Sequence, residues 1–316
     1  MTAQTEEILQ REGAIRLYQT GDGIGIVNFL SKANCCSLEV LQGLHESVEI
    51  AEKSLTGLII HQTNDKFFSV GANLSYVAEL AKTHQTAAIH SYLSFFQETS
   101  LKLKYAKVPI IAAVRGYALG GGCEIAMHCD RIVAHPESKI GLVESAIGLI
   151  PSGGGCKEMI LRASYESNPQ NALKRYFLNI CQGKISTNAD EAREMGYLRS
   201  EDIVTSPSED LLERAKMTLT AFGKKSPPVI PTEIKRESDK ETLIDAYREV
   251  ASEPTPHDLY IVTEIANVFS CHDFSKPTDE KTLLQWELEA FDRLALNPLT
   301  IERIEYTLKT GKHLRN

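Results

Sequence analysis

The first 60 residues show the two hydrophobic spacings that distinguish strands from helices. Three short runs rich in Ile, Leu and Val predict strands, at residues 14–20, 24–29 and 56–63. A GDG sequence between the first two runs predicts a hairpin turn. Apolar residues recur at helical intervals before the third run, at Leu41, Leu44, Val48 and Ala51. The chain therefore opens as an α/β protein.

Predicted strands and helices continue to alternate to about residue 155, after which helical patterns dominate. The apolar run VPIIAAVRG at 108–116 predicts a buried strand, and glycines 120–122 then open a helix. Further strands are predicted within 130–135 and 138–144. The last helix has Asn297 as its cap, Pro298 at its first position and Gly311 beyond its end.

A proline-rich segment at 224–233 is the predicted linker, because proline cannot continue a neighbouring helix. It divides the chain into a core at 1–224 and a helical C-terminal extension at 225–316, predicted to form a contact with another subunit or domain.

Composition narrows the classes of protein. The 316 residues are 42% hydrophobic and 24% charged, and the net charge is −8, which argues against a dedicated nucleic-acid or anionic-membrane surface. Seven cysteines in no paired pattern favour reduced thiols and a cytoplasmic location. The N-terminus lacks the pattern of an export signal, and the longest apolar run is too short to span a membrane.

The segment 117–145 concentrates the candidate chemistry and supports three interpretations. A glycine run at a helix start can bind phosphate, but neither G-x-G-x-x-G nor G-x-x-x-x-G-K-[ST] occurs in the chain. The backbone N–H groups at 120–122 are therefore expected to face an anionic oxygen other than phosphate.

A metal site is the second interpretation. Its candidate ligands are Cys123, His128, Cys129 and His135, but they form no C-x-x-C pair, and the two cysteines are expected to be buried helix residues. Cys156 follows a second glycine run, yet no histidine is placed by sequence to activate it as a nucleophile. No metal is predicted.

The third interpretation is a pair of carboxylates. Glu124 falls in the first turn of the glycine-led helix, and Glu144 lies 20 residues later at the end of the next predicted strand. Most glutamates are surface residues, but these two stand in unusually apolar surroundings, in GGGCEIAM and IGLVESAIGLI. They are the candidate catalytic pair.

Several motifs together resemble the crotonase (enoyl-CoA hydratase/isomerase) superfamily. They are FFSVGANL at 67–74, KVPIIAAVRGYALGGGCEIAMHCD at 107–130, IGLVESAIGLIPSGGG at 140–155 and ISTNADEAREMGYL at 185–198. The chain is most similar to the hydratase half of long bacterial chains that also carry a 3-hydroxyacyl-CoA dehydrogenase. The resemblance implies an α/β crotonase fold of repeated ββα units followed by a helical C-terminal region.

The resemblance also implies an activity, the hydration of trans-2-enoyl-CoA in fatty-acid β-oxidation. The thioester oxygen would be bound by the backbone N–H groups of Ala72 and Gly121, while Glu124 and Glu144 hold the attacking water. Asn73, Leu74 and Ser75 would also contact substrate. CoA enters only as part of the substrate, and no other cofactor is implied.

Departures from the family pattern limit what it implies. Asn73 stands where many members have aspartate, about 60 residues extend beyond a minimal crotonase, and no dinucleotide fingerprint is present. A 3-hydroxyacyl-CoA dehydrogenase domain or subunit is therefore an expected partner, as are further copies of the chain in a trimer or hexamer. The alternatives are another crotonase reaction, such as isomerisation or dehydration, and a noncatalytic acyl-CoA-binding subunit.

Overall fold

The structure is a computed structural model that describes residues 6–223, 225–226, 238–271 and 278–316. The chain forms two compact units, each assembled from separate segments. The first unit contains Met1–Ala72, Glu98–Ile140 and Ser186–Val229, and the second contains Asn73–Gln97, Gly141–Ile185 and Ile230–Asn316. The boundary at 224/225 stays a prediction, because residue 224 and most of the proline-rich segment lie outside the described residues.

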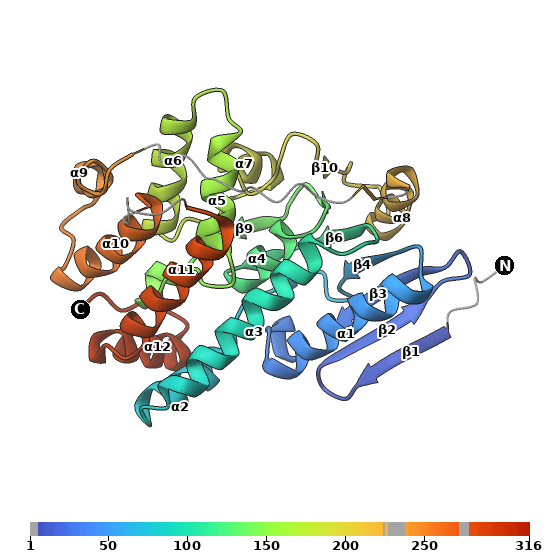
Figure 1. Ribbon diagram of the computed structural model, residues 1–316, viewed down its shortest axis with the longest axis horizontal. Helices are drawn as coiled ribbons and strands as arrows, with labels where there is room; N and C mark the ends of the chain where they lie inside the picture. The colour runs from blue at the N-terminus through green and yellow to red at the C-terminus, as the bar shows by residue number, and fades with distance from the viewer. Residues whose placement is uncertain (1–5, 224, 227–237, 272–277) are drawn as a thin grey trace. The chain divides into compact units, whose positions relative to one another are not determined.

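A seven-stranded sheet forms the centre of the first unit (Figure 1). Its strands, in spatial order, are β1 (Glu6–Arg11), β2 (Ile15–Gln19), β3 (Ile24–Phe29), β4 (Gly57–His61), β6 (Ile110–Val114), β8 (Arg131–Ala134) and β10 (Ile203–Val204). The first three strands pair antiparallel and the later pairs are parallel. The predicted hairpin at GDG is confirmed, since it joins β2 and β3.

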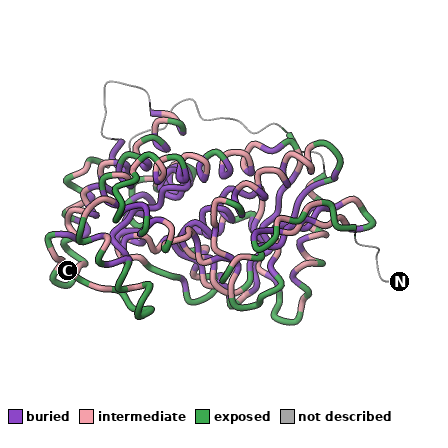
Figure 2. The backbone as a smooth tube through the Cα atoms, turned by 90° about the horizontal axis from the view of Figure 1, so that it is seen from below, coloured by how far each residue is buried: buried purple, intermediate pink, exposed green. Residues whose placement is uncertain are grey.

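Two helices cover this sheet. α8 (Leu211–Phe222) packs Leu211, Ala215 and Leu219 against alternate residues of β3, β4, β6 and β8. α1 (Leu38–Ser54) contacts β2, β3 and β4 through the apolar face that the sequence predicts. Residues of the central strands β4 and β6 are consequently buried, whereas the edge strand β1 is largely exposed. Figure 2 shows buried residues in purple and exposed residues in green along the chain.

A smaller sheet holds the helix led by glycines. It consists of β5 (Phe67–Ser69), β7 (Tyr117–Leu119) and β9 (Lys139–Gly141). α4 (Gly121–Met127) starts directly after β7, so the prediction that the glycine run opens a helix is confirmed. The remaining short elements of this unit are η1 (Lys32–Asn34) and α7 (Ala189–Glu194).

The second unit is mainly helical. Its helices are α2 (Leu74–Lys82), the first part of α3 (Thr86–Lys104), α5 (Gly155–Ser164), α6 (Pro169–Cys181), α9 (Lys240–Val250), α10 (Pro256–Phe269), α11 (Glu280–Ala295) and α12 (Pro298–Thr310). A 3-10 helix, η2 (Glu144–Ile147), also belongs to it. α12 has Asn297 as its N-cap and a left-handed Gly311 at its end, as predicted. None of the helices seen in the described ranges is long and apolar enough to cross a bilayer.

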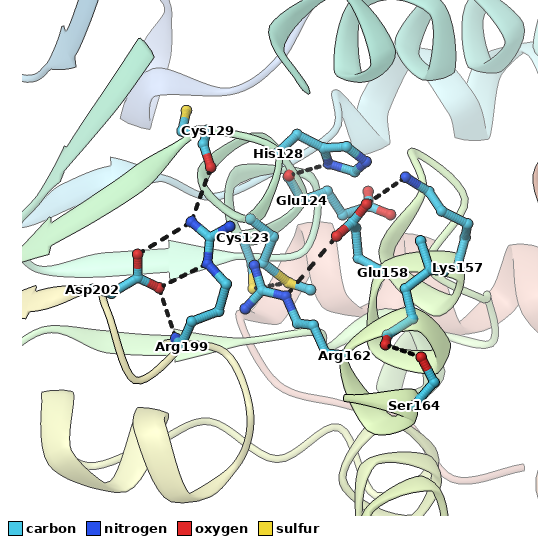
Figure 3. A network of polar contacts seen from close by, with 12 residues as sticks. Cys123, Glu124, His128, Cys129, Lys157, Glu158, Arg162, Ser164, Arg199 and Asp202 are labelled. Carbon is cyan, nitrogen blue, oxygen red and sulfur yellow. Dashed lines mark hydrogen bonds and ion pairs between the residues drawn. The ribbon is translucent and has the colours of Figure 1, made fainter. Parts of the chain in front are cut away.

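A buried ionic cluster connects α11 to the start of α5 in the second unit. The Lys157 side chain is fully buried, and its Nζ lies 2.6 Å from Glu158 Oε1 and 2.9 Å from Glu280 Oε1. Glu287 accepts hydrogen bonds from the backbone N–H groups of Gly154 and Lys157, where a carboxylate also complements the helix dipole. Figure 3 shows Lys157 beside Glu158.

We expect Lys157→Met to lower the free energy of unfolding by about 3 kcal/mol or more, because it removes the buried cation that lies between Glu158 and Glu280. Lys281→Met is the matched control, since Lys281 is exposed in the first turn of α11. The fluorescence of Trp286, the chain's single tryptophan, during denaturant unfolding measures both changes. Equal stability of the two variants would contradict the assignment.

Candidate functional site

Two glycine turns of the first unit approach each other closely. Gly71 has φ +90°, and Gly120, the N-cap of α4, has φ +51°. A Cβ added to Gly71 would lie 2.8 Å from the backbone N of Gly121 and 2.8 Å from the Leu119 carbonyl oxygen. Both the φ value and the contact require glycine at position 71.

Neighbouring polar contacts fix the turn at Gly71. Its N–H donates to Ser69 Oγ at 3.1 Å, and its carbonyl accepts from the Cys36 N–H at 2.7 Å. Ala72 forms an isolated parallel bridge with Cys36. On the other side, a Cβ at Gly122 would come within 2.6 Å of the Ser69 carbonyl oxygen, so the backbones of β5 and α4 also lie close together. The two predicted donor residues, Ala72 and Gly121, are thus held in one region of one unit.

The amides of these two residues are available as donors. Gly121 is the first residue of α4, a position whose N–H has no acceptor within the helix. Within the described ranges, neither the Ala72 nor the Gly121 amide donates to another protein group. Two such donors in one place can bind an oxygen that carries negative charge.

Glu124 lies one turn further along α4. It is 3% exposed, and its backbone carbonyl accepts from His128 Nδ1 at 2.7 Å (Figure 3). Burial raises the pKa of the nearby Cys36 thiol to about 12; the Ser69 hydrogen bond lowers this pKa, and the Glu124 charge raises it. Cys36 therefore stays a neutral thiol near neutral pH.

Glu144 belongs to the second unit and is half-buried at the start of η2. The strand predicted to reach it ends earlier, at Gly141, so Glu144 stands on a helical turn. Ser145 Oγ donates to the Ile180 carbonyl of α6 at 2.5 Å, and Thr300 Oγ1 of α12 donates to the Gly148 carbonyl at 3.0 Å. Bonds at both ends of η2 therefore fix the turn that carries Glu144.

Asn73 caps α2. Its Oδ1 accepts from the Tyr76 N–H at 3.2 Å, and its own N–H donates to Tyr92 Oη at 3.3 Å. Leu74 and Ser75 are the first two residues of α2, half-buried and exposed respectively. The contacts with substrate predicted for these three residues stay predictions.

The cysteines and histidines of the segment serve packing and capping. Cys123 and Cys129 are buried; Cys129 lies just beyond the end of α4, and its Sγ lies 3.4 Å from the Ile125 carbonyl oxygen. Nearby, Arg199 ties the Cys129 carbonyl to Asp202 (Figure 3). In the described parts of the chain, no three His, Cys, Asp or Glu residues are grouped to hold a metal ion.

Two further residues of the FFSVGANL motif shape the site, Gly71 and Ser69, and the sequence alone indicates no role for them. Ser69 places its side chain between Gly71 and Gly122, and Gly71 permits the close approach to Gly121. The sequence feature that could have indicated both residues is the Gly71–Ala72 pair, which follows a short strand that ends at Ser69.

An α/β core that presents two backbone donors beside a buried glutamate defines a class of protein suited to polarising a carbonyl group. The chain belongs to the enoyl-CoA hydratase/isomerase family, whose model matches residues 19–242.

Two relatives illustrate the likeness. The chain is 32% identical to a probable 3-hydroxyacyl-CoA dehydrogenase of Bacillus subtilis over 99% of its own length and 41% of the relative's. It is 30% identical to a probable enoyl-CoA hydratase of Mycobacterium bovis, over 65% of this chain and 72% of that one. It thus spans less than half the length of the Bacillus relative.

Solved structures share the fold. An enoyl-CoA hydratase from Rhodobacter sphaeroides superposes with a TM-score of 0.69 at 14% identity, covering 96% of this chain and 92% of the other. One from Bacillus halodurans gives 0.64 at 17% identity, over 96% and 99%. The predicted crotonase fold is confirmed.

We expect Gly71→Ala to destabilise the first unit more than Gly13→Ala does. Both positions have positive φ, but a Cβ at Gly13 meets nothing within 4 Å, whereas at Gly71 it meets the backbone of Gly121. Gly13→Ala should cost about 1–2 kcal/mol from backbone conformation alone. Denaturant unfolding compares the two variants, and a smaller loss at Gly71 would contradict the close approach.

Proposed function

We propose that this chain is an enoyl-CoA hydratase that adds water across trans-2-enoyl-CoA to give 3-hydroxyacyl-CoA, in the manner of fatty-acid β-oxidation. The observation that carries the proposal is the approach of Gly71 to Gly121, which brings the Ala72 and Gly121 turns together. Family membership and a relative named as a probable enoyl-CoA hydratase support the same activity.

The two amides account for activation of the substrate. When water attacks C3 of the enoyl group, electrons move through the conjugated system and negative charge develops on the thioester oxygen. Preorganised N–H donors at Ala72 and Gly121 stabilise that charge in the transition state. A glycine backbone at 121 also lets the thioester oxygen come close, because no side chain stands in its way.

Glu124 and Glu144 are the proposed acid and base. In this proposal Glu124 accepts a proton from the attacking water as the oxygen adds to C3, and Glu144 delivers a proton to C2. The burial of Glu124 and the fixed turn of Glu144 suit groups that must keep one orientation. CoA takes part as the carrier of the acyl group, with no other cofactor.

The product, a 3-hydroxyacyl-CoA, is the natural substrate of an oxidising step. Relatives named as a probable 3-hydroxyacyl-CoA dehydrogenase and a putative fatty acid oxidation complex trifunctional enzyme extend well beyond the matched region. We propose that a 3-hydroxyacyl-CoA dehydrogenase domain or subunit is the partner of this chain. Assembly into a trimer or hexamer is part of the same proposal.

We expect Glu124→Gln and Glu144→Gln each to lower kcat for hydration by roughly 10²-fold or more, because an amide cannot exchange the proton. Loss of the conjugated thioester, followed spectrophotometrically with short and medium trans-2-enoyl-CoA substrates, measures the rate directly. Glu137→Gln and Glu289→Gln are the matched controls, since both glutamates are exposed, one in each unit.

An unchanged kcat for hydration in both Glu124→Gln and Glu144→Gln would contradict the proposal. A parallel assay with 3-enoyl-CoA separates the alternatives within the family: conversion of that substrate without hydration would identify an isomerase. Tight binding of acyl-CoA esters without turnover at any chain length would identify a noncatalytic subunit.

A further inference from the structure

A buried histidine outside the candidate site begins a series of hydrogen bonds that ends at Glu144. His257 is the second residue of α10 and is 3% exposed. Its Nε2 lies 3.0 Å from Thr300 Oγ1 of α12. Thr300 is fully buried, and its hydroxyl donates to the Gly148 carbonyl at 3.0 Å. All four residues belong to the second unit.

The last step of the series runs through a single peptide group. Gly148 supplies its carbonyl, which accepts from Thr300, and Leu149 supplies its N–H, which donates to the Glu144 carbonyl at 3.0 Å. Because a peptide group is planar, a bond that fixes the carbonyl also fixes the direction of the N–H. The three bonds therefore form a relay from the His257 ring to the backbone of Glu144.

The relay determines which ring nitrogen of His257 carries a proton. A hydroxyl has one hydrogen to donate, and Thr300 gives it to a carbonyl, which can only accept. Thr300 Oγ1 is therefore the acceptor toward the ring, and Nε2 is the donor. Burial lowers the pKa of His257, the Arg303 charge lowers this pKa further, and the Asp258 charge raises it. The ring is consequently neutral near neutral pH, with its proton on Nε2.

A buried histidine can serve packing alone, and two features distinguish this one. First, Thr300 stands directly against η2, because Gly148 has φ +90° and a Cβ added there would lie 2.8 Å from Thr300 Oγ1. Second, the residue after His257 also bonds α12: Asp258 Oδ1 accepts from Nη2 of the buried Arg303 at 2.8 Å. Adjacent residues of α10 thus bond residues one turn apart on α12, which holds the ring against Thr300.

We propose that His257 is a positioning residue for the hydration reaction, because its bond to Thr300 fixes the turn that carries Glu144. The inference rests on the proposed function, since Glu144 has its chemical role only in that reaction. A proton donor must reach C2 along one direction, and a displacement of about 1 Å can cost about 10²-fold in rate. η2 is a single short 3-10 turn, so bonds from neighbouring helices are needed to hold it in one place.

Variants of the two side chains in the relay, made in the full chain, test the proposal. His257→Phe keeps an aromatic ring without an N–H, and Thr300→Val keeps the side-chain shape without a hydroxyl. Each should lower kcat for hydration of trans-2-enoyl-CoA by roughly tenfold while KM changes little, since the proposed thioester donors are not altered. His257→Gln and Thr300→Ser keep a donor at each position and should hold kcat within about threefold of the wild-type value. Thr263→Val is the matched control, because the Thr263 hydroxyl bonds the Leu259 carbonyl within α10.

A double-mutant cycle separates positioning from a loss of folded protein. If His257 acts through Glu144, His257→Phe should change kcat by less than about twofold in the Glu144→Gln background. A loss of folded protein would instead lower kcat by the same factor in both backgrounds. Equal factors in the two backgrounds, or equal kcat in His257→Phe and Thr263→Val, would overturn the proposal. If His257→Phe does not fold, Thr300→Val takes its place in the same cycle.

Hydrogen exchange tests the relay without catalysis. The Leu149 amide should exchange roughly threefold faster or more in His257→Phe and Thr300→Val than in Thr263→Val, because its peptide group loses a bond that fixes it. Equal exchange of this amide in all three variants would overturn the relay, and the proposal with it. A wild-type chain that hydrates no enoyl-CoA would overturn the proposed function, and the exchange rates would still decide for or against the relay.

Discussion

The close approach of two backbone segments, at Gly71 and Gly121, is the constraint on which the candidate site depends. Backbone N–H groups are present at nearly every residue, but most donate within helices and sheets. At this point the end of one strand and the start of one helix meet without side chains between them. Among the described residues, the N–H groups of Ala72 and Gly121 donate to no other protein group. Ser69 maintains the contact by bonding Gly71 and packing on Gly122.

The two units stabilise their functional residues by different means. In the first, the site turns follow β5 and β7 of the smaller sheet, and hydrophobic packing of α8 on the seven-stranded sheet adds rigidity to the unit. In the second, hydrogen bonds and buried charges act together with the packing of the helices. Lys157 and Glu287 connect α11 to the start of α5, while Ser145 and Thr300 fix η2 from neighbouring helices.

Much of the fold could be predicted from local pattern, while the site required contacts that pattern does not contain. β3, β4, β6, α1 and α12 appear where spacing and caps place them. β5, β7 and β10 span only two or three residues, too short for a period to be visible, and β1 is an exposed edge strand with little apolar signal. The meeting of Gly71 with Gly121 joins segments 50 positions apart, so only the resemblance to a known family pointed to it.

The structure explains why an amide is suitable at Asn73, where many family members have aspartate. The resemblance alone left open what an amide does where many members have aspartate, beside the Ala72 donor in sequence. Its Oδ1 caps α2, and asparagine and aspartate are about equally good at that position. A neutral amide keeps the cap without adding a negative charge next in sequence to a residue whose N–H is proposed to face a developing anion. Helix capping therefore permits either residue, and the electrostatics of the proposed reaction favour the amide.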